Sequence, residues 1–275
     1  MSVAKPQRGA RVQRGHPLAR GLVGFWAFNE GPSSPYVYDL SGNDNHGTLT
    51  NMDPETDWAE GGCLLSDANA GHMALEKMGS LPIGSENRTV AARWKTSDTG
   101  LITDSNAIIG WGNDVNDGQE FWVSVEDNEL SVRVDNGSRL WTANGAANGD
   151  WHIGAWTLDG DNTSDMVCYM DGVLLAVAST AARTLNTASV NPVIGRRPAQ
   201  DVFRFDGVID CISVLDRALS ASAVSELYHD PWAVLRAPTR TWFLPPIVGG
   251  YPIRLVSYGG LVGPGGLTAA SGLVA

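Results

Sequence analysis

The sequence predicts an all-β fold, a two-sheet antiparallel sandwich of the jelly-roll type, and three observations support this. Short runs of β-branched and aromatic residues recur along the chain, and several alternate between apolar and polar positions. Turn residues separate these runs, with Asp171-Gly172 as a two-residue hairpin turn. The 32 glycines and 10 tryptophans are typical of a turn-rich β protein, and no regular alternation of strand and helix patterns is present.

The expected strands follow one another with short turns between them. They cover residues 21–28, 88–97, 106–112, 120–127, 129–135, 152–160, 167–177 and 205–216. One short helix is expected near 220–230, where Ser220 is a suitable N-cap and Pro231 ends the pattern. Val224, Leu227 and Tyr228 would share its apolar face.

Composition divides the chain into a basic extended arm (1–20), a sandwich domain (21–231) and an apolar Gly/Pro-rich tail (232–275). The arm carries five of the basic residues and no acid, whereas all 30 acidic residues lie between 21 and 230. The tail is apolar but is interrupted too often by proline and glycine to form a helix or to bury its own apolar groups. We therefore expect arm and tail to pack against a neighbour in a homo-oligomeric assembly, with solvated tails as the alternative.

Cysteine usage and hydropathy bear on the compartment. Cys63, Cys168 and Cys211 are widely spaced without a CxxC pair, which favours buried free thiols over zinc or redox chemistry and suits a reducing compartment. The basic start lacks the cleavage pattern of a signal peptide, and no apolar run is as long as a membrane helix. We expect synthesis in a host cytoplasm and no membrane partner.

Two segments at opposite ends of the sandwich domain carry a family resemblance. "GLVGFWAFNEG…YDLSGNDNHGTLTN" (21–51) resembles the opening of laminin G-like domains of the concanavalin A-like superfamily. "FDGVIDCISVLDRALSASAVSELY" (205–228) is similar to the closing strand and short helix of that family, and the paired strands at 149–160 and 168–176 agree in order and spacing. The resemblance implies a two-sheet antiparallel jelly roll whose first and last strands are adjacent.

A second resemblance concerns the junction "LYHDPWAVLRAPTRTWF" (227–243), which is similar to the ends of laminin G-like virion proteins encoded by tailed bacteriophages. It implies a non-enzymatic structural protein on a phage-like virion surface, as a head decoration or a tail or fibre component. Residues 1–20 and 232–275 would anchor it to other copies and to other virion proteins. This is the preferred functional hypothesis from sequence.

The stretch "DLSGNDNHG" (39–47) allows a metal loop, a catalytic loop or a turn. It lacks the glycine and glutamate positions of an EF-hand. The laminin G-like resemblance implies a calcium ion held by Glu30, Asp39, Asn43 and Asp210, although Cys211 replaces a second acid that the family often has in its closing strand. The alternative, which we favour, is a turn whose Asp and Asn side chains bond their own backbone.

Carbohydrate binding, with or without calcium, is the alternative function. Trp58, Trp111 and Trp141 lie near predicted loops and could stack on sugar rings, with packing into the core as the alternative. A glycoside hydrolase is a third hypothesis, in which Glu126, Asp127 and Glu129 would supply the acids. Asp127-Asn128 reads as a turn, so we expect no catalytic pair on one strand face. Direct nucleic-acid binding is disfavoured, because the acidic body would repel phosphates.

Overall fold

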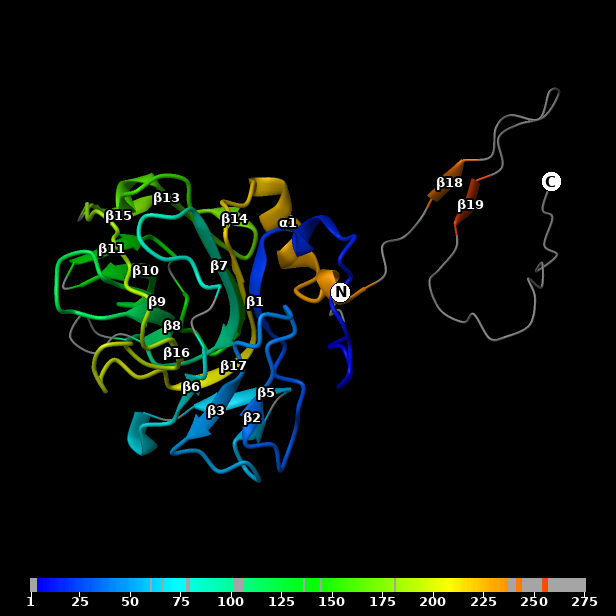
Figure 1. Ribbon diagram of the computed structural model, residues 1–275, viewed down its shortest axis with the longest axis horizontal. Coiled ribbons are helices and arrows are strands. Elements are labelled where there is room, and N and C mark those ends of the chain that lie inside the picture. Colours follow the sequence, from blue (N-terminus) through cyan, green and yellow to red (C-terminus); the bar gives the residue numbers. More distant parts are fainter. Residues whose placement is uncertain are drawn as a thin grey trace. The chain divides into compact units, whose positions relative to one another are not determined.

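The computed structural model describes residues 4–236, except positions 60, 66, 78–79, 101–105, 136, 144 and 181, together with the backbone of 241–243 and 254–256. Two antiparallel sheets face each other in residues 4–236 (Figure 1). The all-β jelly-roll sandwich predicted from the sequence is therefore confirmed. No helix among the described residues is long and apolar enough to span a membrane.

The first sheet is built around the domain's closing strand. Its strands run in the order β14-β13-β12-β7-β17-β5-β4, and β1 also pairs with β17. Their bounds are β1 Leu22–Trp26, β4 Trp58–Ala59, β5 Gly62–Leu65, β7 Arg88–Lys95, β12 Trp151–Leu158, β13 Met166–Met170, β14 Val173–Leu174 and β17 Gly207–Leu215. Leu22 of β1 lies opposite Leu215 of β17, so the predicted adjacency of first and last strands is observed.

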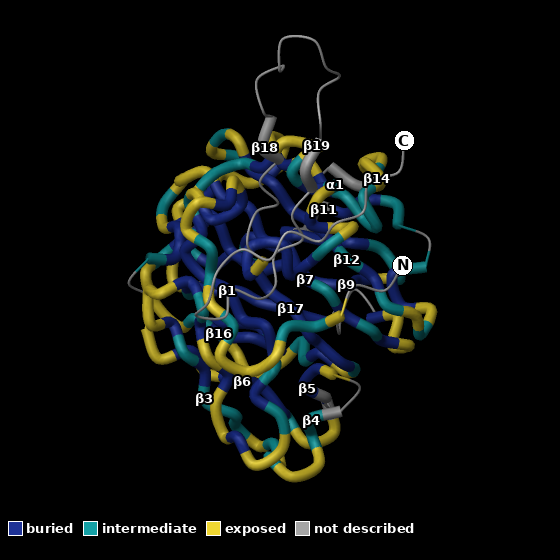
Figure 2. The backbone as a smooth tube through the Cα atoms, turned by 90° about the vertical axis from the view of Figure 1, so that its right-hand side faces the viewer, coloured by how far each residue is buried: buried dark blue, intermediate teal, exposed yellow. Residues whose placement is uncertain are grey.

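The second sheet has the order β15-β11-β10-β9-β8-β16-β6-β3-β2. Its strands are β2 Tyr36–Val37, β3 Gly47–Thr50, β6 His72–Leu75, β8 Asn106–Gly112, β9 Glu120–Glu126, β10 Glu129–Val134, β11 Gly137–Trp141, β15 Val177–Thr180 and β16 Val193–Ile194. Asp127 and Asn128 form the turn between β9 and β10, both with positive φ, as expected for a tight hairpin. Figure 2 shows the buried strands in the middle of the molecule and exposed loops at its rim.

Tryptophan fills the space between the sheets. Trp26, Trp94, Trp111, Trp141 and Trp156 all belong to one apolar cluster and are at most 1% exposed. The three cysteines are buried free thiols, as predicted, and burial raises the pKa of each thiol above its usual value.

A buried ion pair fixes the start of β9. The Arg197 guanidinium donates from Nε to both Glu120 carboxylate oxygens at 2.9 Å and from Nη2 to Oε2 at 2.6 Å. Glu120 is 0% exposed and Arg197 is 5% exposed. The backbone N–H of Ala199 donates to the same carboxylate at 3.1 Å, so the loop after β16 is tied to β9.

The expected helix is present as α1 (Ala221–His229), with the Ser220 side chain accepting a bond from the Ala223 N–H. Its Val224 and Leu227 pack in a second apolar cluster, on the outer side of the first sheet. Four short 3-10 helices also occur in the described residues: η1 Pro17–Ala19, η2 Asp67–Asn69, η3 Thr163–Asp165 and η4 Ala233–Leu235. The second cluster includes both η1 and η4.

The described part of the arm lies on its own domain. Gln13 donates from its backbone N–H to the Val234 carbonyl at 2.8 Å, and Arg236 donates to the Ala4 carbonyl at 2.8 Å. Trp232 is buried, so residues 232–236 of the predicted tail belong to the compact body. Residues 237–275 form a separate unit, in which β18 (Thr241–Phe243) pairs with β19 (Arg254–Val256). The other tail positions, which the assembly prediction also uses, lie outside the described residues.

Candidate functional site

Both carboxylate oxygens of Asp39 accept hydrogen bonds that hold the opening turn. Its Oδ1 accepts bonds from the backbone N–H groups of Phe25 at 2.9 Å and Ser41 at 2.8 Å. Its Oδ2 accepts from the Ser41 hydroxyl at 2.8 Å and from the Asn45 N–H at 3.1 Å. The Asn43 amide donates to the Val23 carbonyl at 3.1 Å. These hydrogen bonds are those expected if residues 39–47 form a turn, the alternative to a calcium loop.

Glu30 and Asp210 are in a different situation, because each is buried with one oxygen unused. Glu30 Oε1 accepts from the Tyr38 N–H at 2.8 Å, and Asp210 Oδ2 binds Arg93 Nη1. Glu30 Oε2 and Asp210 Oδ1 have no hydrogen-bond partner in the described structure. Burial raises the pKa of Glu30 above its usual value, and it raises the pKa of Asp210 to about 6 against the opposing effect of Lys5 and Arg93.

These positions do not fit a calcium ion as one set. The Asp39 carboxylate and the Asn43 amide are engaged within the turn, whereas Glu30 and Asp210 interact with the ammonium of Lys5. Among the residues described, no three His, Cys, Asp or Glu side chains gather as a metal ion would require. The four-residue calcium site stays a prediction.

The three candidate tryptophans have different surroundings. Trp111 and Trp141 are 0% and 1% exposed, so the structure corrects their proposed sugar contact to core packing. The Trp111 indole N–H donates to the Pro82 carbonyl at 2.7 Å, which explains its burial at the end of β8. Trp58 is half-buried and lines a cavity of about 310 Å³ between the arm and the domain, with its N–H bonded to Ser34. Trp58 alone keeps the predicted role open.

The acidic hairpin does not offer a catalytic pair. Glu126 and Glu129 lie opposite each other in the β9–β10 pairing, on either side of the predicted turn. The Glu126 side chain is 0% exposed, and its Oε2 accepts from Arg133 at 2.8 Å and from Ser131 at 3.1 Å. A buried carboxylate held by arginine cannot reach a substrate.

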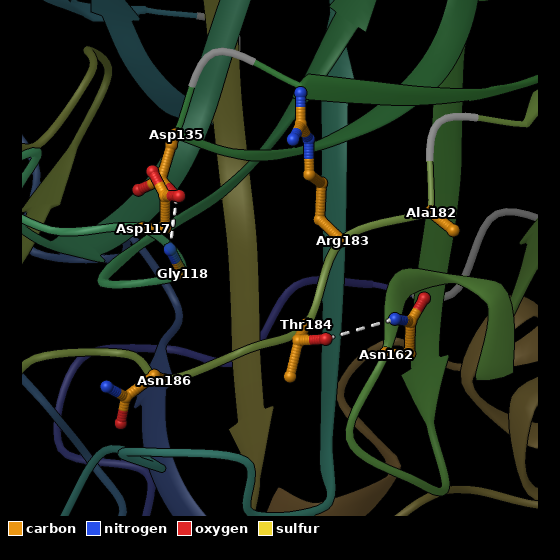
Figure 3. A pocket seen from close by; sticks show the side chains of 8 residues that line it. All are labelled: Asp117, Gly118, Asp135, Asn162, Ala182, Arg183, Thr184 and Asn186. Atoms are coloured by element: carbon orange, nitrogen blue, oxygen red, sulfur yellow. Dashed lines mark hydrogen bonds between the residues drawn. The ribbon is translucent and has the colours of Figure 1, made fainter.

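A polar pocket of about 430 Å³, which the sequence analysis did not predict, forms where several loops meet (Figure 3). Its described lining combines two acids, an arginine, two asparagines and a threonine, with no aromatic residue among them. The lining residues are Asp117, Gly118, Asp135, Asn162, Ala182, Arg183, Thr184 and Asn186. They come from the β8–β9 loop, the end of β10, the N-cap of η3 and the segment after β15.

Backbone hydrogen bonds fix these loops to one another. Asp135 accepts from the N–H of Gly118 and, at 3.2 Å, from that of Glu120, so its carboxylate holds the β8–β9 loop. The Asn186 N–H donates to the Gly118 carbonyl at 2.8 Å. Gly118 has φ +82°, and a Cβ there would lie 2.6 Å from the Thr184 carbonyl oxygen, so this close approach requires glycine. The pocket walls are therefore set by backbone contacts.

Three side chains of the pocket keep free polar groups. Among the described residues, the Arg183 guanidinium, the Asp117 carboxylate and the Asn186 amide form no hydrogen bond or ion pair. Arg183 is positioned by its backbone, which donates to the Thr163 hydroxyl at 2.9 Å and accepts from the Thr163 N–H at 2.8 Å. Its side chain runs toward the β10–β11 turn, against Gly137 (Figure 3).

This arrangement presents one cationic donor, one anionic acceptor and one amide that does both, on loops held by hydrogen bonds. With Asp135 and Arg183 included, the lining carries two acids and one base. It suits a neutral ligand with many hydroxyl groups. Residues from 117 to 186 contribute, and the only trace in the sequence is the density of Asn, Asp and Gly in separate loops.

Comparison with known proteins gives one family and many structures of the same fold. The model of the concanavalin A-like lectin/glucanases superfamily matches residues 67–225, more than half of the chain. Domain 4 of AbnA, an arabinanase from Geobacillus stearothermophilus solved with arabinotriose, is 20% identical with a TM-score of 0.52, covering 75% of this chain and 98% of that one. Trypanosoma rangeli sialidase is 14% identical with a TM-score of 0.53, covering 78% of this chain and 33% of that one. A search of curated proteins finds no match.

Proposed function

Because this chain belongs to the concanavalin A-like lectin/glucanase superfamily, we propose that it is a non-catalytic carbohydrate-recognition module. The proposal places the sugar in the polar pocket of Figure 3. The observation that carries it is the set of unpaired polar groups of Arg183, Asp117 and Asn186 around a cavity of about 430 Å³. The arabinotriose named with the AbnA domain supports an oligosaccharide as the class of ligand.

The chemistry of these three side chains matches sugar hydroxyl groups. Each hydroxyl can donate one hydrogen bond and accept two, so a carboxylate, a guanidinium and an amide together can pair with neighbouring hydroxyls. Two acids against one arginine disfavour an acidic sugar, since a carboxylate on the ligand would be repelled. We therefore expect neutral oligosaccharides to bind better than sialylated ones.

Binding is expected to be weak. The lining residues that the structure describes include no aromatic face, and a typical hydrogen bond contributes a net ~1 kcal/mol. About four such bonds correspond to a Kd on the order of 1 mM. A module of this affinity gains useful binding when several copies act together.

Sugar recognition is preferred over hydrolysis because the described lining of the pocket does not present two carboxylates that are both open to a ligand. A retaining glycosidase needs two carboxyl groups about 5–5.5 Å apart, both able to reach the substrate. In this pocket Asp135 accepts bonds from two backbone N–H groups and acts as a structural residue. Asp117 is then the single pocket carboxylate in the described lining that is open to a ligand.

The experiment is a titration of the full chain with neutral arabino-oligosaccharides and with sialyllactose, followed by NMR or calorimetry. Arg183→Ala should weaken binding about 10–100-fold, as expected for loss of a charge-assisted hydrogen bond. Arg11→Ala, which removes an exposed arm arginine outside the pocket, is the matched control and should bind like the wild type. Absence of binding to a broad glycan array, or equal binding by Arg183→Ala, would refute the proposal.

The virion role stays a prediction with less support than recognition. It requires the arm to engage neighbouring subunits, whereas residues 4–20 pack on their own domain. Its remaining basis is the tail beyond residue 236. Native mass spectrometry of the full chain tests it directly, since a stable homo-oligomer that is lost on removing 237–275 would restore it. The two roles are compatible.

A further inference from the structure

Lys5 reaches from the arm into the domain, where its ammonium is surrounded by oxygen atoms. The Nζ donates to the carbonyl of Gly61 and, at 3.0 Å, to the carbonyl of Asp210. It also lies 5.2 Å from the centre of the Trp232 ring, a cation–π distance. One side chain thus connects the arm, the β4–β5 turn, β17 and the segment after α1.

The surroundings of this ammonium carry excess negative charge. Asp210 and Glu30 both attract Lys5, and each is nine-tenths or more buried. Each also keeps one carboxylate oxygen, Asp210 Oδ1 and Glu30 Oε2, without a hydrogen-bond partner in the described structure. Arg93 is the only other basic side chain that acts on Asp210 in the described structure, and it uses the opposite oxygen, Oδ2. Buried anionic oxygens beside backbone carbonyls are the surroundings of a bound cation.

We infer that the Lys5 ammonium is the resident cation of this site, in the place where the laminin G-like resemblance implies a calcium ion. Glu30 and Asp210, two of the four predicted ligands, attract the lysine electrostatically, and Asp39 and Asn43 are engaged in their turn. An ammonium has three donors and no acceptor, and here it bonds the carbonyl oxygens of Gly61 and Asp210 at once. Unlike a metal ion, it is covalently tethered, so filling the site also fixes the arm.

If Lys5 fills this site, both calcium and the removal of Lys5 have predictable effects on the stability of the protein. Calcium should not stabilise the wild type, because a ligand raises stability only when it binds the folded state. Removing the ammonium should leave Arg93 as the remaining cation that acts on Asp210 and Arg8 as the remaining cation that acts on Glu30, so both buried carboxylates lose part of their charge compensation. The emptied site should then accept calcium from solution, which favours carboxylate and carbonyl oxygens.

The test measures the Tm of the full chain in EGTA and in millimolar calcium chloride, for the wild type, Lys5→Ala, Lys5→Met and the control Arg11→Ala. In EGTA, Lys5→Ala and Lys5→Met should lower Tm by roughly 5–10 °C relative to Arg11→Ala, which removes a cation from an exposed position of the same arm. Lys5→Met keeps the length of the side chain, so it separates loss of charge from loss of packing. Calcium should restore part of the loss in Lys5→Ala and leave the wild type and Arg11→Ala unchanged.

Three outcomes would overturn the inference. A wild-type Tm that rises with calcium would show that the metal, and not Lys5, occupies the site. A Tm for Lys5→Ala equal to that of Arg11→Ala would show that the ammonium does not neutralise the site. A Lys5→Met protein as stable as Arg11→Ala, with Lys5→Ala destabilised, would reduce Lys5 to a packing contact.

Discussion

Replacing Arg197 by methionine should destabilise the domain strongly, because it leaves Glu120 charged and buried. The Glu120 carboxylate is 0% exposed and receives its three side-chain contacts from Arg197. Removing one partner of a buried ion pair costs about 3–5 kcal/mol. At about 2–4 °C per kcal/mol for a domain of this size, Tm should fall by about 6–20 °C. Thermal unfolding followed by circular dichroism measures it.

The double variant Glu120→Gln/Arg197→Met is the critical comparison. Removing both charges abolishes the uncompensated anion, so the pair should recover at least half of the loss in Arg197→Met. The Ala199 N–H still has an acceptor in the glutamine side chain, which limits secondary damage. If Arg197→Met cost less than about 1 kcal/mol, or if the double variant were as unstable as the single one, the assignment of this pair as a buried charge pair would be refuted.

The remaining predictions concern the opening turn and one buried histidine. Asp39→Ala removes the acceptor of four hydrogen bonds and should lower the free energy of unfolding, measured by urea titration, by about 3 kcal/mol. The control Ser33→Ala, in an exposed turn, should lower it by under about 1 kcal/mol. Equal effects of the two substitutions would contradict the role given to Asp39. Burial lowers the pKa of His72 below its usual value of 6.5, so the unfolded chain takes up the proton first and stability should fall as pH drops through 6.5 and below. His72→Gln should flatten this part of the pH profile of Tm, and an unchanged profile would assign the effect to another group.

The long strands were predicted well because each is a local run of β-branched and aromatic residues bounded by turn residues. The run 106–112 is β8 in full, and the turns at 127–128 and 171–172 lie where their residue types require. Some of the shortest strands were missed. β16, only two residues long at Val193–Ile194, exists because β6 and β8 on either side supply its hydrogen bonds. This strand depends on tertiary pairing, and two residues are too few to show an alternation of apolar and polar positions.

Two of the three candidate tryptophans, Trp111 and Trp141, were misplaced for a related reason. Trp111 appeared to be a loop residue because it stands near the end of its run, yet β8 is buried on both faces and the Pro82 carbonyl covers the indole N–H. The polar pocket joins Asp117, Asp135 and Arg183 from loops whose proximity depends on the sheet order β15-β11-β10-β9-β8. Lys5 has partners 56 and 205 residues away. No local sequence pattern predicts these contacts between distant residues.

The antiparallel pairing of β1 with β17 determines how the domain would respond to mechanical force. Leu22, where the chain enters the sheet, lies opposite Leu215, where it leaves. A pull applied through both flanking segments would load the hydrogen bonds of this pair one after another, as in opening a zipper, and not all together in shear. Outside the pair, the Arg236–Ala4 hydrogen bond and the Lys5–Trp232 cation–π contact bridge the same two segments and would bear the load first. The domain should therefore yield to low force in two steps, release of this clasp and then peeling of β1.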